Sequence, residues 1–223
     1  MLSVIGDYLV YGIGIALSPM AIVGFILMLV SAGGLAKAWA FIGGWAGGTA
    51  IGLILISLLV KGGSDDNASG TNTAMAWVRI LLGVLLVALA WHQWQSRPKK
   101  GQAATLPKWM QAMDTVTPAK AVGLGAFLAA LNPKNLPLLI STSGVIGQGG
   151  LNGGELFGVI VIFVVLATLG MLLPMFVFLS AGEKGAVILD EVREWLVGNN
   201  ATIMAVLFLI LGFSIIGKGL NGL

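Results

Sequence analysis

The sequence predicts an all-α, polytopic membrane protein with six transmembrane helices. The chain has 223 residues, of which 57% are hydrophobic and 9% are charged, whereas soluble domains carry roughly 25% charged residues. Several uncharged runs reach the length of about 20 residues that a helix needs to cross the hydrocarbon core. No run has the apolar and polar alternation of a barrel strand, so helices are the structure that satisfies the backbone in lipid.

Six runs qualify as spans. In chain order they cover residues 8–36, 38–60, 74–94, 121–147, 156–179 and 195–217; the third carries Arg79 and the fourth carries Lys134. Residues 62–73 between the second and third spans are acidic and rich in turn formers, as in an exposed loop. Two further segments, around Trp109 and over residues 188–196, have helical periodicity. Each is either an interfacial helix or an extension of the next span.

The distribution of basic residues predicts the orientation. Eight Lys and Arg residues lie in the loops after the first, third and fifth spans, against three on the opposite side. Because Lys and Arg are enriched in cytoplasmic loops, both termini are expected outside and the loop before residue 120 in the cytoplasm. Asp7 and Arg79 then lie near the external interface, where an ion pair between them is one alternative.

An internal repeat divides the chain. The tetrapeptide ALSP at residues 16–19 returns as ALNP at residues 130–133, and Gly33-Gly34-Leu35 returns as Gly149-Gly150-Leu151. Three predicted spans precede the second copy, so the two halves cross the membrane in opposite senses, as inverted repeats do. The predicted organisation is a first three-helix repeat over residues 1–96, a cytoplasmic linker with an interfacial helix over 97–119, and a second repeat over 120–223.

Both repeats carry a proline near the middle of their first span. A proline in a helix interior removes a backbone hydrogen bond and costs about 3 kcal/mol. Pro19 and Pro133 are therefore expected to break helices 1 and 4 near the bilayer midplane, leaving free backbone groups that can bind polar ligands. The alternative is a pair of simple kinks that Ser18 and Asn132 satisfy.

Lys134 makes the second break a candidate binding site. A lysine at this depth costs at least ~2.5 to 3.5 kcal/mol, and no Asp or Glu lies within a run to neutralise it. Its expected partner is a ligand anion, water, or carbonyls freed by Pro133 and Pro137, and a neutral or snorkelling lysine is the alternative. Replacement by Met is expected to weaken binding but to leave folding intact. The predicted substrate-binding residues are Lys134, Asn132, Asn135, Ser18, Pro19 and Pro133.

Composition excludes several other functions. The absence of cysteine rules out disulfides and thiolate metal sites, and the single histidine, His92, lies between Trp91 and Trp94 as an interfacial residue does. An enzyme would need an acid/base pair or a metal site. We therefore predict no catalytic residue, metal or cofactor. The net charge of +3 is too small, and its basic residues too dispersed, for a nucleic-acid partner.

One family shares these motifs. The segment LPKWM at residues 106–110, Asp114, Thr117-Pro118 and LNPKNL at residues 131–136, together with ALSP at the first break, resemble the peptidoglycolipid-addressing proteins. These are also called sulfolipid-addressing proteins and belong to the lysine exporter superfamily.

The resemblance implies a multi-pass protein of the bacterial inner membrane. Its expected function is export or translocation of an anionic cell-envelope glycolipid, or of a related anionic small molecule. The alternatives are an amino-acid exporter of the same superfamily and a non-transporting accessory subunit of an envelope lipid export machine. The expected partners are the lipid or anionic substrate and the bilayer, with a homo-oligomer or an export partner as further options.

Overall fold

The computed structural model describes residues 2–62, 68–98, 113 and 115–223. These residues contain no strand, so the all-α prediction is confirmed for them. Their helices, in chain order, are α1 (Leu2–Ala16), α2 (Pro19–Val30), α3 (Gly34–Gly62), α4 (Ala68–Gln95), α5 (Pro118–Ala130), α6 (Asn135–Gln148) and α7 (Gly153–Leu220).

Several helices have the length and composition of membrane spans. Within the described residues, α3, α4 and α7 are each long and apolar enough to cross a bilayer, and α1 with α2 makes a fourth candidate if the bent pair counts as one span. Helices α5 and α6 are apolar but shorter. The prediction of a helical membrane protein is therefore confirmed.

The chain is broken at both predicted prolines. Helix α1 ends at Ala16 and α2 begins at Pro19, with a bend of 47° between the two axes. Pro19 stands at the start of α2, where the missing N–H of a proline costs no helical hydrogen bond. The second break separates Ala130, the last residue of α5, from Asn135, the first residue of α6.

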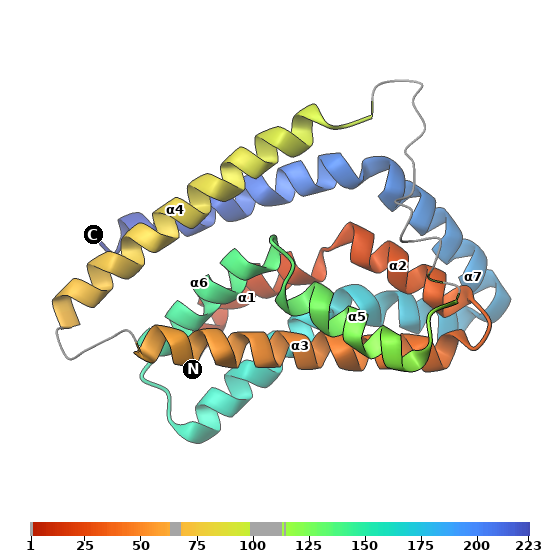
Figure 1. Ribbon diagram of the computed structural model, residues 1–223, viewed down its shortest axis with the longest axis horizontal. Coiled ribbons are helices and arrows are strands. Elements are labelled where there is room, and N and C mark those ends of the chain that lie inside the picture. Colours follow the sequence, from red (N-terminus) through yellow and green to blue (C-terminus); the bar gives the residue numbers. More distant parts are fainter. Residues whose placement is uncertain (1, 63–67, 99–112, 114) are drawn as a thin grey trace.

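Helix α7 consists of two helices that meet at Gly182. This residue has φ 54° and ψ −126°, a conformation that glycine alone adopts readily. Figure 1 shows α7 running to one end of the bundle and returning beside α4 after its bend. Gly33 and Gly150 also have positive φ, and they make the turns before α3 and α7. Both lie in the repeated glycine pairs, so the two copies of this motif form similar turns.

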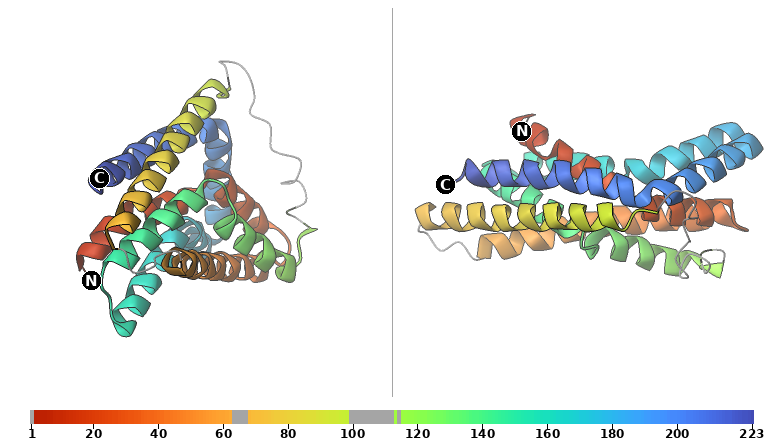
Figure 2. Two further views of the ribbon diagram at one scale, coloured as in Figure 1. Left: turned by 60° about the vertical axis from the view of Figure 1, so that its left-hand side comes forward. Right: turned by 90° about the horizontal axis from the view of Figure 1, so that it is seen from above.

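Glycines bring two helix pairs into backbone contact. In the pair α3 and α5, a Cβ on Gly44 or Gly48 would collide with the backbone of Val122 or Ala126. In the pair α4 and α7, a Cβ on Gly212 would lie 2.9 Å from the carbonyl oxygen of Gly83. Such small residues let helices approach closely in membranes. Figures 1 and 2 show α5 beside part of α3, and α4 beside the part of α7 that follows its bend.

The first part of α7 packs on the first broken helix. The hydroxyl of Tyr8 donates a hydrogen bond of 3.0 Å to the carbonyl oxygen of Val159, and its ring meets Phe163 edge on. Deeper in the core, Trp45 of α3 donates from Nε1 to the carbonyl oxygen of Ala167 at 2.9 Å. These bonds join α7 to helices of the first half of the chain.

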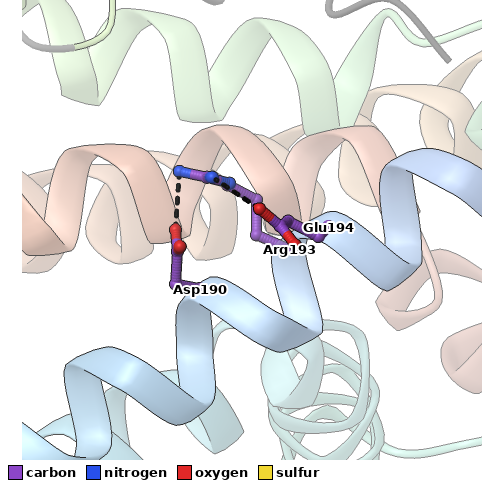
Figure 3. Close-up of polar contacts among 3 residues, drawn as sticks. All are labelled: Asp190, Arg193 and Glu194. Atoms are coloured by element: carbon purple, nitrogen blue, oxygen red, sulfur yellow. Dashed lines mark ion pairs between the residues drawn. The ribbon is translucent and has the colours of Figure 1, made fainter. Parts of the chain in front are cut away.

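The segment 188–196 is a continuous part of α7. Leu189 and Leu196 are buried, whereas the charged residues of its other face form a small surface cluster (Figure 3). Arg193 pairs with Asp190 at 2.7 Å and lies 3.9 Å from Glu194. This continuity favours the extension alternative over a separate interfacial helix. The segment around Trp109 lies outside the described residues, apart from Met113, which is buried.

The two ends of the described chain lie at the same end of the bundle, and the bend of α7 lies at the other (Figures 1 and 2). This arrangement requires an even number of crossings if the bundle spans a bilayer. Both termini would then lie on one side; the six spans and their orientation stay predictions.

Candidate functional site

The first break leaves backbone carbonyls without their usual helical donors. Pro19 has no N–H, and the carbonyl oxygen of Ile15 accepts instead from the hydroxyl of Ser18 at 2.8 Å. The backbone N–H of Ser18 donates to the carbonyl oxygen of Ala16 at 2.9 Å. It therefore does not donate to the carbonyl oxygen of Gly14, as it would in a continuous helix. Carbonyls that are buried in lipid need other donors, because each unpaired polar group costs on the order of several kcal/mol there.

Lys134 of the second break supplies the missing donors. Its Nζ donates to the carbonyl oxygen of Gly14 at 2.6 Å and to that of Leu17 at 3.1 Å. The residue is 4% exposed. The carbonyls lie at the C-terminal end of α1, where the helix dipole favours a cation. Of the three partners considered from the sequence, the carbonyls freed by Pro133 and Pro137 are not the ones that Lys134 bonds, because its carbonyl partners come from the opposite break.

Asn132 closes the turn of the second break. Its side-chain oxygen accepts from the backbone N–H of Lys134 at 3.0 Å, and its carbonyl oxygen accepts from Asn135 and Leu136 at 2.8 and 3.1 Å. The first amides of α6 are therefore already bonded. They are not the open anion site that free N–H groups at a helix start would provide.

Asn135 holds the end of α5 and is fully buried. Its Nδ2 donates to the carbonyl oxygens of Leu128 and Ala129 at 3.1 and 3.0 Å. Its Oδ1 has no hydrogen-bond partner in the described part of the chain. The side chain replaces the backbone donors that α5 loses at its C-terminus, a position where carbonyls need such partners.

The two breaks face a common cavity of about 210 Å³. Ser18 and Pro19 line it from the first break, and Asn132 and Lys134 line it from the second. Pro133 and Asn135 do not line it. Four of the six predicted binding residues are thus brought together, and the other two shape the break behind them.

Two polar residues that the sequence analysis did not select complete this cavity. Gln93 of α4 and Asn200 of α7 line it together with the breaks. The Oδ1 of Asn200 is buried and has no hydrogen-bond partner among the described residues. Asn200 could have been selected from the sequence, because it is a polar residue inside the sixth apolar run. Gln93 was not selected because the tryptophans around it indicate a membrane interface.

An apolar groove adjoins the cavity on the same two helices. It has a volume of about 300 Å³ and is lined only by apolar side chains: Val87, Ala90, Trp91, Trp94, Ala205, Val206 and Leu209. Trp94 follows Gln93 and Ala205 lies five residues after Asn200, so the two spaces lie within about one and a half helical turns of each other. The guanidinium of Arg97 lies 3.8 Å from the centre of the Trp94 ring.

The cavity suits an anionic, hydroxyl-bearing group. Lysine carries three protons, and two of those of Lys134 are bonded to carbonyls. The third is not bonded to another described residue. The amides of Gln93 and Asn200 can each donate and accept, which fits hydroxyl groups. In the described residues, no cluster of three His, Asp or Glu side chains could hold a metal ion.

Comparison with known proteins gives one match. The family model for Sap, sulfolipid-1-addressing protein, matches residues 8–221. No curated protein and no solved structure matches the chain. Because the match covers nearly the whole chain, including both breaks and every residue that lines the cavity, the protein belongs to the Sap, sulfolipid-1-addressing protein, family.

Proposed function

We propose that this protein translocates an anionic, hydroxyl-bearing lipid across the bacterial inner membrane, with its headgroup bound in the cavity between the two breaks. The observation that carries the proposal is the buried Lys134, a residue that lines a polar cavity beside an apolar groove. A lysine is a compact charge suited to a sulfate, phosphate or carboxylate. Asn132, Gln93 and Asn200 would bind the neutral part of the headgroup.

The apolar groove favours a lipid over a free amino acid. A headgroup in the cavity would place an acyl chain along the groove between α4 and α7, where Trp91 and Trp94 stand. Tryptophan prefers the membrane interface, where its amphipathic ring lies at the level of the headgroups. Arg97, stacked on Trp94, adds a cation at the same end of the groove. An amino acid would use the cavity and leave the groove empty.

The proposal includes six spans in two inverted three-helix halves. Counting α1 with α2, α5 with α6, and the two parts of α7 as spans gives six with α3 and α4. The packing supports the symmetry, because α3 contacts α5 of the second half while the first part of α7 contacts α1 of the first half. Both termini would lie outside. The protein would work without a catalytic step, alone, as a homo-oligomer or with an envelope export partner.

A flux assay tests the proposal. The purified full-length chain is reconstituted in liposomes that contain NBD-labelled phosphatidylglycerol, an anionic lipid with free hydroxyl groups, and external dithionite reports the label that reaches the outer leaflet. We expect faster movement of this probe than in empty liposomes. NBD-phosphatidylcholine, which is zwitterionic, should move much less. Lys134→Met should slow the anionic probe roughly 10- to 100-fold, the loss of about 1.5 to 3 kcal/mol that one charged hydrogen bond contributes.

The other outcomes decide between the alternatives. Uptake of radiolabelled lysine or aspartate without movement of either lipid would replace the proposal by an amino-acid exporter. No movement of any probe by a correctly folded protein would favour the accessory subunit. A matched control is Lys120→Met, because Lys120 is exposed at the start of α5 and away from the cavity. It should leave the rate unchanged.

A further inference from the structure

A second buried cation lies on α4, away from the cavity at the breaks. Arg79 is 7% exposed. No hydrogen bond or ion pair joins it to another residue in the described part of the chain. The side chain of Asp7, the partner considered from the sequence, lies outside that part. A buried arginine without a partner is costly in a membrane protein and marks a functional site by default.

Gly144 gives the guanidinium of Arg79 its place against α6. A Cβ built on Gly144 would lie 2.7 Å from the Nη2 of Arg79, so a side chain at this position would displace the guanidinium. The arginine therefore reaches from α4 across to α6, and the glycine at residue 144 leaves room for the guanidinium in this position. Its five N–H donors are presented at this surface in a rigid fork.

The same face of α6 presents a hydroxyl group without a partner. Ser141 precedes Gly144 by three residues, which places both on one helix face. Ser141 is 1% exposed, and its Oγ has no hydrogen-bond partner among the described residues. The next two hydroxyls differ: Thr142 donates to the carbonyl oxygen of Leu138 at 2.8 Å, and Ser143 to that of Leu53 at 3.4 Å. The open hydroxyl is thus specific to the side that Arg79 occupies.

These groups lie on the path from the cavity to the end of the bundle that holds the termini. Ser141 is seven residues beyond Lys134 on α6, which corresponds to about 10 Å along the helix. Arg79 is fourteen residues from Gln93 on α4, about 21 Å at the same rise. Figure 1 shows that α6 runs toward that end and that α4 begins there. The second cation therefore lies toward the predicted external side.

We propose that Arg79 and Ser141 form a second oxyanion site, which receives the headgroup after it leaves Lys134. The guanidinium would bind two oxygens of a sulfate or phosphate in a bidentate manner, and the Ser141 hydroxyl would donate to a third. The order of the two sites rests on the proposed function, but binding at Arg79 does not. On moving from Lys134 to Arg79, the headgroup would exchange a contact with one ammonium group for a more directional contact of two oxygens with the guanidinium.

Anion binding by the purified full-length protein in neutral detergent tests this site. The probes are inorganic phosphate and dioctanoyl phosphatidylglycerol, titrated by calorimetry. We expect Arg79→Gln to bind one equivalent of the lipid fewer than the wild type, and Ser141→Ala to weaken that equivalent by about 3- to 10-fold. Ser143→Ala is the matched control, since its hydroxyl is adjacent but already bonded. It should change neither affinity nor stoichiometry.

The variants separate the possible failures. If Arg79→Gln and Ser141→Ala both bind as the wild type does, the second site is wrong, whatever Lys134→Met does. If Lys134→Met binds and transports normally while Arg79→Gln loses an equivalent, the proposed function fails at its first site and the second site stands. Phosphate bound without the lipid would identify a soluble anion as the ligand of this site.

Two further results would overturn the proposal. If Asp7→Asn reverses the loss of thermal stability caused by Arg79→Gln, the arginine is a partner of Asp7. If Arg79→Gln does not fold, Gly144→Ala and Ser141→Ala decide, because the first displaces the guanidinium and the second removes only the hydroxyl. Unchanged lipid binding in both would exclude the site.

Discussion

The Nζ of Lys134 donates a hydrogen bond of 2.6 Å to the carbonyl oxygen of Gly14, which lies 120 residues earlier in the chain. One buried side chain thus closes the open backbone of the first break from within the second. The bond couples the two halves at their helix breaks. Under the proposed function, an anion at Lys134 would compete with these carbonyls for the ammonium group, and its binding would then be linked to the geometry of the first break.

Lys134→Met is expected to lower the thermal stability of the protein. The substitution leaves the carbonyl oxygens of Gly14 and Leu17 buried without their donor, and each unpaired buried group costs about 1 to 3 kcal/mol. This loss outweighs the relief of removing a buried charge that is already well bonded. Thermal unfolding in detergent, followed by circular dichroism, measures it. An unchanged or higher melting temperature for Lys134→Met, with Lys120→Met as reference, would contradict this expectation.

This expectation reverses the one drawn from the sequence, where Lys134→Met left folding intact. The pattern of residues revealed that the lysine stands at a break, since ALSP and ALNP mark both breaks and a proline cannot continue a helix interior. It could not reveal which carbonyls the lysine meets. That pairing depends on how the two broken helices pack, and tertiary contacts of this kind leave no periodic signal in the chain.

Other parts of the fold differ in how far the sequence predicts them. Apolar length predicted α3 and α4, because crossing the hydrocarbon core constrains every residue of a span. The sharp bend of α7 at Gly182 was not predicted. The charged residues around position 183 favoured a loop between two spans, whereas in the structure the chain turns at a single glycine. Asn200 and Gln93 were missed for another reason. Each is a single polar residue, and whether it lines a cavity depends on which residues of other helices pack beside it.

Asn135→Leu is expected to destabilise the second break. Its Nδ2 serves two carbonyls at the end of α5, and the residue is fully buried, so water cannot replace those bonds. The loss is about 1 to 3 kcal/mol for each carbonyl left unpaired. Asn199→Leu is the matched control, because Asn199 makes the same type of bond to Trp195 at 2.9 Å in an exposed position. Equal melting temperatures for the two variants would show that Asn135 does not hold the break.

Gly48→Ala is expected to separate α3 from α5, whereas Gly47→Ala is not. A Cβ at Gly48 would lie 2.6 Å from the backbone of Ala126, while nothing lies within 4 Å of a Cβ at Gly47. Overpacking costs about 1 to 3 kcal/mol, and alanine in an open helical position gains up to about 1 kcal/mol over glycine. Melting temperatures of the two variants should therefore move in opposite directions. A loss at Gly47 as large as at Gly48 would contradict this packing.

Single cysteines test the predicted orientation, because the native chain contains none. Ser96, just after α4, and Asn221, just after α7, are both exposed. The excess of basic residues in the loop after α4 predicts that Ser96 lies in the cytoplasm and Asn221 outside. On intact spheroplasts, an impermeant maleimide should label Asn221→Cys at once and Ser96→Cys only after permeabilisation. The reverse pattern would invert the topology, and it would also move the proposed order of the two anion sites, because the Arg79 end of the bundle would then face the cytoplasm. If both variants are labelled without permeabilisation, Ser96 and Asn221 lie on the same side of the membrane. The chain between them would then cross the membrane an even number of times, not the three times predicted.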